Sequence, residues 1–257
     1  MSDLEEVSML SALRSSVEHL PSVVEPLSDA QLDEPAYPAE WTIAEVLSHI
    51  GSGAVIMQRR LDDIVQGRAT PDDFAPGVWE TWNAKSARAK AEDALVADRD
   101  LLERIESLSD EARSSFRFSM GPLELLFDGF VGMRLNEHAL HTWDVEVSLD
   151  PSATLPTNSA AHIVDNLELI ARFTGRPTES TQSIAVRTEQ PRRDFSIELS
   201  PDAIALGAED QSRSPDLELP AEAFVRLIYG RLDPAHTPNA VRDSGVLEEL
   251  REVFPGP

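Results

Sequence analysis

The first 150 residues contain four long segments of helical character, and this pattern most constrains how the chain can fold. Residues 3–24 carry apolar side chains three and four positions apart, and residues 78–108 are rich in strong helix formers. Residues 42–67 open with Thr42 and Glu45, spaced as in a capping box, and residues 123–147 form the fourth segment. Four long helices joined by moderate connections predict a four-helix bundle over residues 1–150.

After Asp150 the pattern changes to short elements. Residues 151–158 (PSATLPTN) are typical of a linker, and a helix is expected over residues 159–174. Alternating segments at residues 183–189, 195–201, 203–209 and 216–220 predict the strands of a small antiparallel sheet. Two further helices are expected over residues 221–232 and 246–254. The fold class is therefore α plus α+β, with an α+β domain over residues 151–257.

Charge and composition exclude several classes of partner. The chain has 22 basic and 46 acidic side chains, a formal net charge of −24, which argues against nucleic acid and anionic membranes. No apolar run reaches the roughly 18 residues of a membrane span, and the acidic N-terminus does not resemble a signal peptide. We therefore expect a soluble cytoplasmic protein. Cysteine is absent, so any thiol chemistry requires a bound small molecule, and an anionic substrate requires local arginines.

The stretch LNEHALHTWD, residues 135–144, concentrates two of the six histidines with two carboxylates. A helix turns about 100° per residue, which places Glu137 and His141 on one side. The same side of the helix carries an apolar stripe, which consists of Leu123, Leu126, Phe130 and Met133. Asp144 also lies on this side. The stripe predicts that Glu137 and His141 face the bundle core, whereas His138 lies about 100° away from it.

A buried carboxylate and imidazole are costly unless they pair or coordinate a cation. Glu137 and His141 supply two ligands suited to zinc or a similar divalent metal, and His49, among small residues of the second helix, is the candidate third. Spacing alone leaves other interpretations open. His49 is also compatible with a hydrogen-bonded core or rim histidine, and Glu137 with His141 forms an acceptable intrahelical ion pair. Asp144 either orients His141 or caps and pairs locally.

Four segments carry a resemblance to a known family. EWTIAEVLSHI, VWETWNAKSARAKAEDALVADRDLL and RLNEHALHTWDVEV, in this order, resemble the mycothiol-dependent maleylpyruvate isomerase family, whose N-terminal half is a DinB-type four-helix bundle. AFVRLIYGRLDP resembles the family's smaller α+β domain, which is related in shape to sterol-carrier proteins. The resemblance extends over nearly the whole chain.

The resemblance implies a set of site residues. A divalent metal, usually zinc, would be held by His49, Glu137 and His141, and the sulfur of mycothiol would take the open metal position. Arginine from the C-terminal domain would serve the active site, which makes Arg231 the catalytic candidate and Arg226 its reserve. Arg134, one turn before Glu137, is a further candidate for cofactor binding. Two tryptophans in these motifs, Trp41 and Trp143, are interpreted as packing anchors in preference to substrate platforms.

The implied reaction is addition of a metal-bound thiolate to an electrophilic small molecule that bears carboxylates. Its outcome is either cis–trans isomerisation or transfer of the thiol to give an S-conjugate. Two alternatives remain at this point: a DinB-type hydrolase that uses metal-bound water, and a non-catalytic metal- or ligand-binding protein. The expected partners are the electrophile and a low-molecular-weight thiol, with a monomer or homodimer as the assembly.

Overall fold

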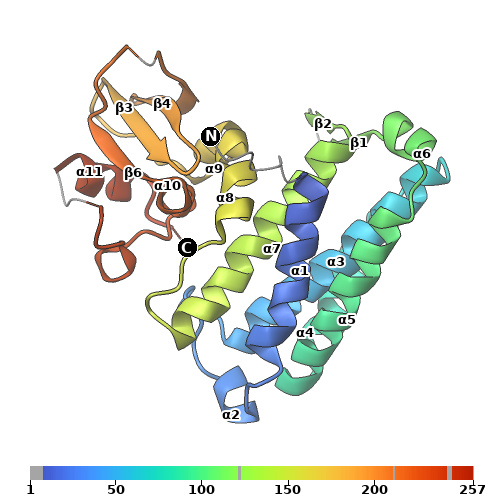
Figure 1. The fold of residues 1–257 in the computed structure, drawn as a ribbon. Coiled ribbons are helices and arrows are strands. Elements are labelled where there is room, and N and C mark those ends of the chain that lie inside the picture. The colour runs from blue at the N-terminus through green and yellow to red at the C-terminus, as the bar shows by residue number, and fades with distance from the viewer. Residues whose placement is uncertain (1–7, 121–122, 211, 242–244, 257) are drawn as a thin grey trace, which may run out of the picture. The chain divides into compact units, whose positions relative to one another are not determined.

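The computed structural model describes residues 8–120, 123–210, 212–241 and 245–256, and the chain divides into two compact units, Met1–Asp150 and Pro151–Pro257 (Figure 1). The elements of the first unit are α1 (Met9–Val24), α2 (Asp29–Leu32), α3 (Ile43–Val65), α4 (Phe74–Asn83), α5 (Ala87–Glu106), α6 (Asp110–Ser115), β1 (Phe118–Met120), β2 (Leu123–Leu125) and α7 (Phe127–Leu149).

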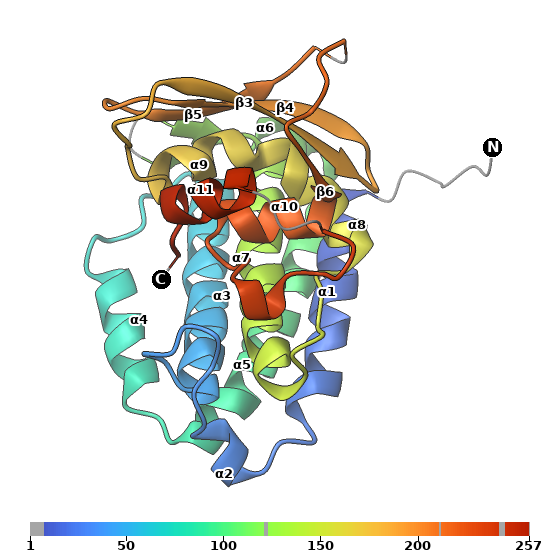
Figure 2. The same ribbon diagram turned by 90° about the vertical axis from the view of Figure 1, so that its left-hand side faces the viewer.

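Four of these helices form the predicted bundle. Helix α1 packs against α5 and α7, and α3 packs against the same two helices, which closes a ring of four around one core (Figures 1 and 2). Each helix contributes fully buried apolar side chains to that core, among them Leu13, Leu47, Leu101 and Phe130. Burial of these apolar faces is the main source of the bundle's stability.

The start of α3 is fixed by the capping box that the sequence predicts. The Thr42 side chain accepts a hydrogen bond from the Glu45 amide at 3.2 Å, and the Glu45 carboxylate accepts one from the Thr42 amide at 2.8 Å. Two amides at the helix start are thereby satisfied. Because the cap sets where the helix begins, it also sets the direction in which His49, in the second turn, points.

Two of the expected long helices differ from the structure. The segment predicted over residues 78–108 is divided into α4 and α5, because Ser86 caps a new helix by accepting from the Ala89 amide. The segment predicted to begin at Leu123 is strand there: β1 and β2 form an antiparallel hairpin, and α7 begins only at Phe127. Residues 3–7 of the first segment and the predicted loop end at residues 121–122 lie outside the described residues.

Gly51 permits the close approach of three helices. A Cβ atom added there would lie 2.5 Å from Cζ3 of Trp82 on α4 and 2.9 Å from Cα of Ala94 on α5. We expect Gly51→Ala to lower the free energy of unfolding by about 1–3 kcal/mol, since overpacking outweighs the gain in helix propensity. Urea denaturation measures this change. Gly77→Ala in α4, where nothing lies within 4 Å, is the control and is expected to be neutral or stabilising; equal effects would contradict the packing argument.

The second unit is a four-stranded sheet with helices. Its elements are α8 (Thr157–Ile163), η1 (Val164–Asn166), α9 (Leu167–Thr174), β3 (Gln182–Glu189), β4 (Arg193–Leu199), β5 (Ile204–Ala208), β6 (Leu217–Pro220), α10 (Ala221–Ile228), η2 (Pro234–His236) and α11 (Gly245–Val253). The strand order is β5-β4-β3-β6, and α9 and α10 pack on the sheet (Figure 2).

The sheet is mixed, so the prediction of an antiparallel sheet was wrong for one strand. Strands β3, β4 and β5 are antiparallel neighbours, but β6 runs parallel to β3, with Val186 opposite Leu217. The chain crosses from β5 at one edge to β6 at the other, and alternation alone does not encode that crossing. None of the helices in the described part of the chain combines the length and the hydropathy that a membrane span requires.

Candidate metal centre

His49, Glu137 and His141 come together where α3 packs against α7. The Nε2 atom of His49 lies 3.2 Å from Oε2 of Glu137, and Nε2 of His141 lies 3.7 Å from the same oxygen. The two imidazole rings are 4.6 Å apart between centroids. One ligand atom from each residue lies within 4.8 Å of the others, a spacing that a single metal ion could bridge. The structure therefore brings together the three residues that the sequence had singled out.

The chemistry of this donor set fits a divalent cation. Asp144 is buried, and its Oδ2 lies 2.8 Å from Nδ1 of His141, which leaves Nε2 of that ring on the side of Glu137. Burial alone would raise the pKa of Glu137, but hydrogen bonds from His141 and His49 outweigh it and hold this pKa below its usual range. Two imidazoles and an ionised carboxylate are a ligand set of catalytic zinc sites, which keep a position open for water or substrate.

Two tryptophans near the site have different surroundings. Trp143 is fully buried and packs on Tyr37 at 4.9 Å between ring centroids, as expected of a packing anchor. Trp41 is 37% exposed, and its ring lies 5.5 Å from His49 and 6.4 Å from His141 between centroids. The indole of Trp41 therefore borders both imidazoles. The interpretation of Trp41 as a packing anchor did not include this contact with the candidate centre. The indole covers one side of the candidate centre with an apolar surface.

His138 belongs to a separate buried network. Its Nδ1 lies 2.8 Å from Oγ of Ser16 on α1, and its Nε2 lies 3.0 Å from Oδ2 of Asp98 on α5. The other Asp98 oxygen pairs with Arg134, which also donates to the Ile50 carbonyl at 3.0 Å. Burial would raise the pKa of Asp98, yet Arg134 and His138 lower it overall. The network ties all four helices of the bundle together and is closed to solvent.

The prediction that the side of α7 with Glu137 and His141 faces the bundle core was wrong, although both residues do lie close to His49. His138 is completely buried, whereas Gly129, Met133, Glu137 and His141, spaced by four, form the less buried line along the middle of the helix. The reason is that α7 is covered on most of its circumference and buries polar side chains as well as apolar ones. Apolar residues therefore do not mark its inner face. The candidate centre lies on a partly exposed side of α7, not in the bundle interior.

The three arginines of the sequence analysis are all largely buried. Arg134 is held in the network described above, which gives it a structural role, so its part in cofactor binding stays a prediction without support from its packing. Arg226 donates to both carboxylate oxygens of Glu222, at 2.8 and 3.1 Å, inside the second unit. Arg231 donates to the Tyr229 carbonyl at 3.0 Å. The catalytic and cofactor roles of Arg231 and Arg226 stay predictions.

Asp98, Ser16 and the contact of Trp41 with the site were missed at the level of sequence. A signal for Asp98 is present, because it interrupts a buried stripe on α5 whose other members are Ala91, Ala94, Leu101 and Ile105. A carboxylate at such a position requires a buried partner. Nothing comparable identifies Ser16, since serine is common on helix surfaces.

Asp144 offers a test of how the candidate centre is supported. We expect Asp144→Asn to weaken metal binding by about 10–100-fold, because the amide no longer fixes His141 as a carboxylate does. Competition with a chelating dye measures the affinity, and circular dichroism verifies the fold. Asp128→Asn, an exposed change on the same helix, is the control. Equal affinities for the two variants would show that Asp144 does not act on the site.

The chain matches known proteins in family and in fold. Residues 13–146 match the model of the mycothiol maleylpyruvate isomerase N-terminal domain. A crystal structure of the mycothiol-dependent maleylpyruvate isomerase is similar, with a TM-score of 0.63 and 14% identity over 87% of this chain and 88% of that one. A histidine-to-alanine mutant of a mycothiol-dependent maleylpyruvate isomerase matches with the same values. No curated protein matches the chain.

A third solved structure, YfiT from Bacillus subtilis, has an unusual four-helix bundle topology and matches with a TM-score of 0.41 at 15% identity, over 58% of this chain and 90% of that one. The fold of the chain is a helical bundle followed by a mixed α+β unit. Because the family model covers more than half of its residues, the chain belongs to the mycothiol maleylpyruvate isomerase N-terminal domain family.

Proposed function

We propose that the protein is a divalent-metal- and mycothiol-dependent enzyme that adds a thiol to an electrophilic small molecule. The observation that carries this proposal is the convergence of His49, Glu137 and His141, in a chain that belongs to this family. Zinc is the ion that this ligand set suits best. When bound, such an ion lowers the pKa of a coordinated thiol, so that the sulfur is nucleophilic at neutral pH.

The residues of the chain have distinct parts in this proposal. His49 and His141 would hold the ion through Nε2, and Glu137 would supply one negative charge, so that the site would keep a net positive charge for an anionic sulfur. Asp144 fixes the ring of His141 through its Nδ1 atom, 2.8 Å away. Trp41 excludes water from one side of the site, which strengthens electrostatic interactions there.

The substrate we propose is an electrophile with a conjugated double bond and at least one carboxylate. Addition of the sulfur forms a carbon–sulfur bond and leaves a single bond about which the molecule can rotate. The electron pair displaced from the double bond is held by the conjugated carbonyl group as an enolate. Its return expels the sulfur and completes a cis–trans isomerisation, whereas protonation of the enolate by solvent, with the sulfur retained, completes an S-transfer. Arg231 is the proposed partner of the substrate carboxylate, because a guanidinium pairs with it through two hydrogen bonds.

Calorimetry with mycothiol tests the thiol requirement. Metal-loaded protein is expected to bind mycothiol with release of a proton, and metal-stripped protein is expected to bind it at least about tenfold more weakly. Mycothiol blocked at its sulfur separates binding of the sulfur from binding of the rest of the molecule. Absence of thiol binding by protein shown to contain metal would overturn the thiol-dependent reaction and would favour a metal-dependent hydrolase.

A further inference from the structure

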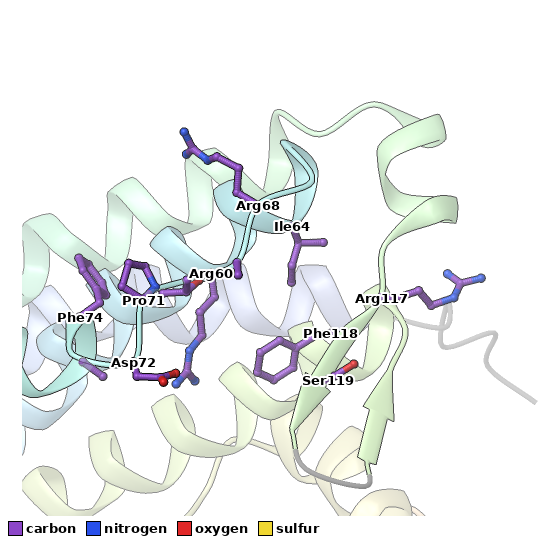
Figure 3. Close-up of a pocket in the computed structure, with 12 residues that line it drawn as sticks. Arg60, Ile64, Arg68, Pro71, Asp72, Phe74, Arg117, Phe118 and Ser119 are labelled. Atoms are coloured by element: carbon purple, nitrogen blue, oxygen red, sulfur yellow. The ribbon is translucent and has the colours of Figure 1, made fainter.

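A cavity lies in the bundle unit toward the C-terminal end of α3, whereas the candidate metal centre lies near the N-terminal end of that helix. It has a volume of about 600 Å³ and is formed between the C-terminal half of α3, the segment after it and strand β1 (Figure 3). This size is within the range of small-molecule binding pockets. Arg60 and Ile64, which line it, follow His49 by 11 and 15 residues, so about 16–22 Å of helix separate the two sites. The cavity is therefore distinct from the candidate centre.

The segment that forms one wall of the cavity is anchored to a buried carboxylate. Asp63 is 1% exposed, and its side chain accepts hydrogen bonds from Arg59 at 2.7 Å, Arg68 at 3.1 Å and Thr70 at 2.9 Å. The guanidinium of Arg59 also lies 4.9 Å from the ring centroid of Phe74. These contacts hold residues 68–74 against the end of α3, so the wall is a built structure that does not depend on a ligand.

The charge of the lining is opposite to that of the chain. Three arginines, Arg60, Arg68 and Arg117, stand against a single carboxylate, Asp72, in a protein with a net charge of −24. Arg68 is engaged with Asp63, and Arg117 donates to backbone carbonyls and points away from the cavity in Figure 3. Arg60 is therefore the cation that the cavity itself presents.

Arg60 is partly buried, and its guanidinium has N–H donors that make no hydrogen bond to a described residue. Its guanidinium lies 5.8 Å from the ring centroid of Phe118, and among the residues that the structure describes none accepts a hydrogen bond from it or forms an ion pair with it. Figure 3 shows its side chain extending from α3 toward the segment that carries Asp72. The apolar side chains that line the cavity include Ile64, Phe74 and Phe118. A guanidinium with open donors beside aromatic rings suits a planar anion with an apolar body.

We propose that this cavity binds a small organic carboxylate with an aromatic or hydrocarbon body, whose carboxylate pairs with Arg60 while its body packs against Phe118 and Phe74. The cavity contains none of the candidate metal ligands, so this proposal can be tested separately from the proposed function.

Titration with benzoate, followed by ligand-detected NMR, tests this proposal. Wild-type protein is expected to bind benzoate in the millimolar range or tighter, and to bind the neutral isostere benzamide at least about tenfold more weakly. Arg60→Gln is expected to lose about 10–100-fold in affinity for benzoate. Arg99→Gln, the same charge change at an exposed position of α5, is the control and is expected to leave the affinity unchanged.

Two more variants distinguish benzoate bound in this cavity from benzoate bound elsewhere on the protein. Ala69→Trp fills the exposed rim of the cavity with a large side chain and is expected to weaken benzoate binding without loss of the fold. His141→Ala removes a candidate metal ligand and is expected to bind benzoate as wild type does. Benzoate binding that survives Arg60→Gln, that disappears in His141→Ala, or that does not differ from benzamide binding would overturn the proposal, as would no binding to the wild type at about 10 mM.

Discussion

His49→Ala and His141→Ala are each expected to bind zinc more than about 100-fold more weakly than the wild type, so that purified variants contain little metal. Loss of a residue that only hydrogen-bonds to a metal ligand already lowers the metal affinity about 10–100-fold, and loss of the ligand atom itself lowers it further. Each histidine supplies one of only three protein ligands, and neither helix offers a replacement within the 4.8 Å cluster. Elemental analysis of protein purified without chelators measures the metal per chain.

His19→Ala is the matched control for these variants. His19 lies on α1 and pairs with Glu146 on α7 at 2.5 Å, so it is a partly exposed histidine of the same bundle outside the candidate centre. This variant is expected to retain about one ion per chain. Metal content that falls equally in all three variants would indicate nonspecific histidine binding, and wild-type content in His49→Ala or His141→Ala would contradict the assigned ligands.

Asp98→Ala is expected to lower the free energy of unfolding by about 3–5 kcal/mol. The substitution leaves two buried groups without their carboxylate: the guanidinium of Arg134, 2% exposed, and the imidazole of His138, 0% exposed. An unpaired charge inside the bundle is far more costly than the loss of a surface ion pair. Urea denaturation followed by circular dichroism measures the change.

Two comparisons make the Asp98 experiment specific. Asp100→Ala, an exposed change two residues along the same helix, is expected to alter stability by less than about 0.5 kcal/mol. Replacing Asp98 and Arg134 together with apolar residues of similar size is expected to cost less than Asp98→Ala alone, since the buried guanidinium charge is removed together with its partner. A loss under about 1 kcal/mol for Asp98→Ala would show that the network contributes little to stability.

The elements encoded by local interactions were predictable from the sequence. The capping box of Thr42 and Glu45 depends on residues three apart, and it marked the start of α3 correctly. The strands of the second unit were likewise found from their alternation, with boundaries within a few residues. The break between α4 and α5 was missed, because Ser86 lies in a run of strong helix formers that conceals its capping role.

Features that depend on tertiary contacts were harder to predict. Glu137 and His141 were selected from their angular positions on the helix, under the assumption that its apolar side faces the bundle core. In the structure, α7 instead buries His138 and leaves Glu137 and His141 on a partly exposed side. The selection succeeded because residues four apart share a side whichever way that side points. The parallel pairing of β6 with β3 also depends on a chain crossing that no local pattern records.

A crystal of the zinc-loaded protein, measured at the zinc absorption edge, would locate the metal directly. We expect one anomalous peak per chain, about 2.0–2.2 Å from Nε2 of His49, Nε2 of His141 and a carboxylate oxygen of Glu137, with a non-protein ligand completing the coordination. An anomalous peak that lies elsewhere, or one without His49 among its ligands, would show that these three side chains do not form a metal centre.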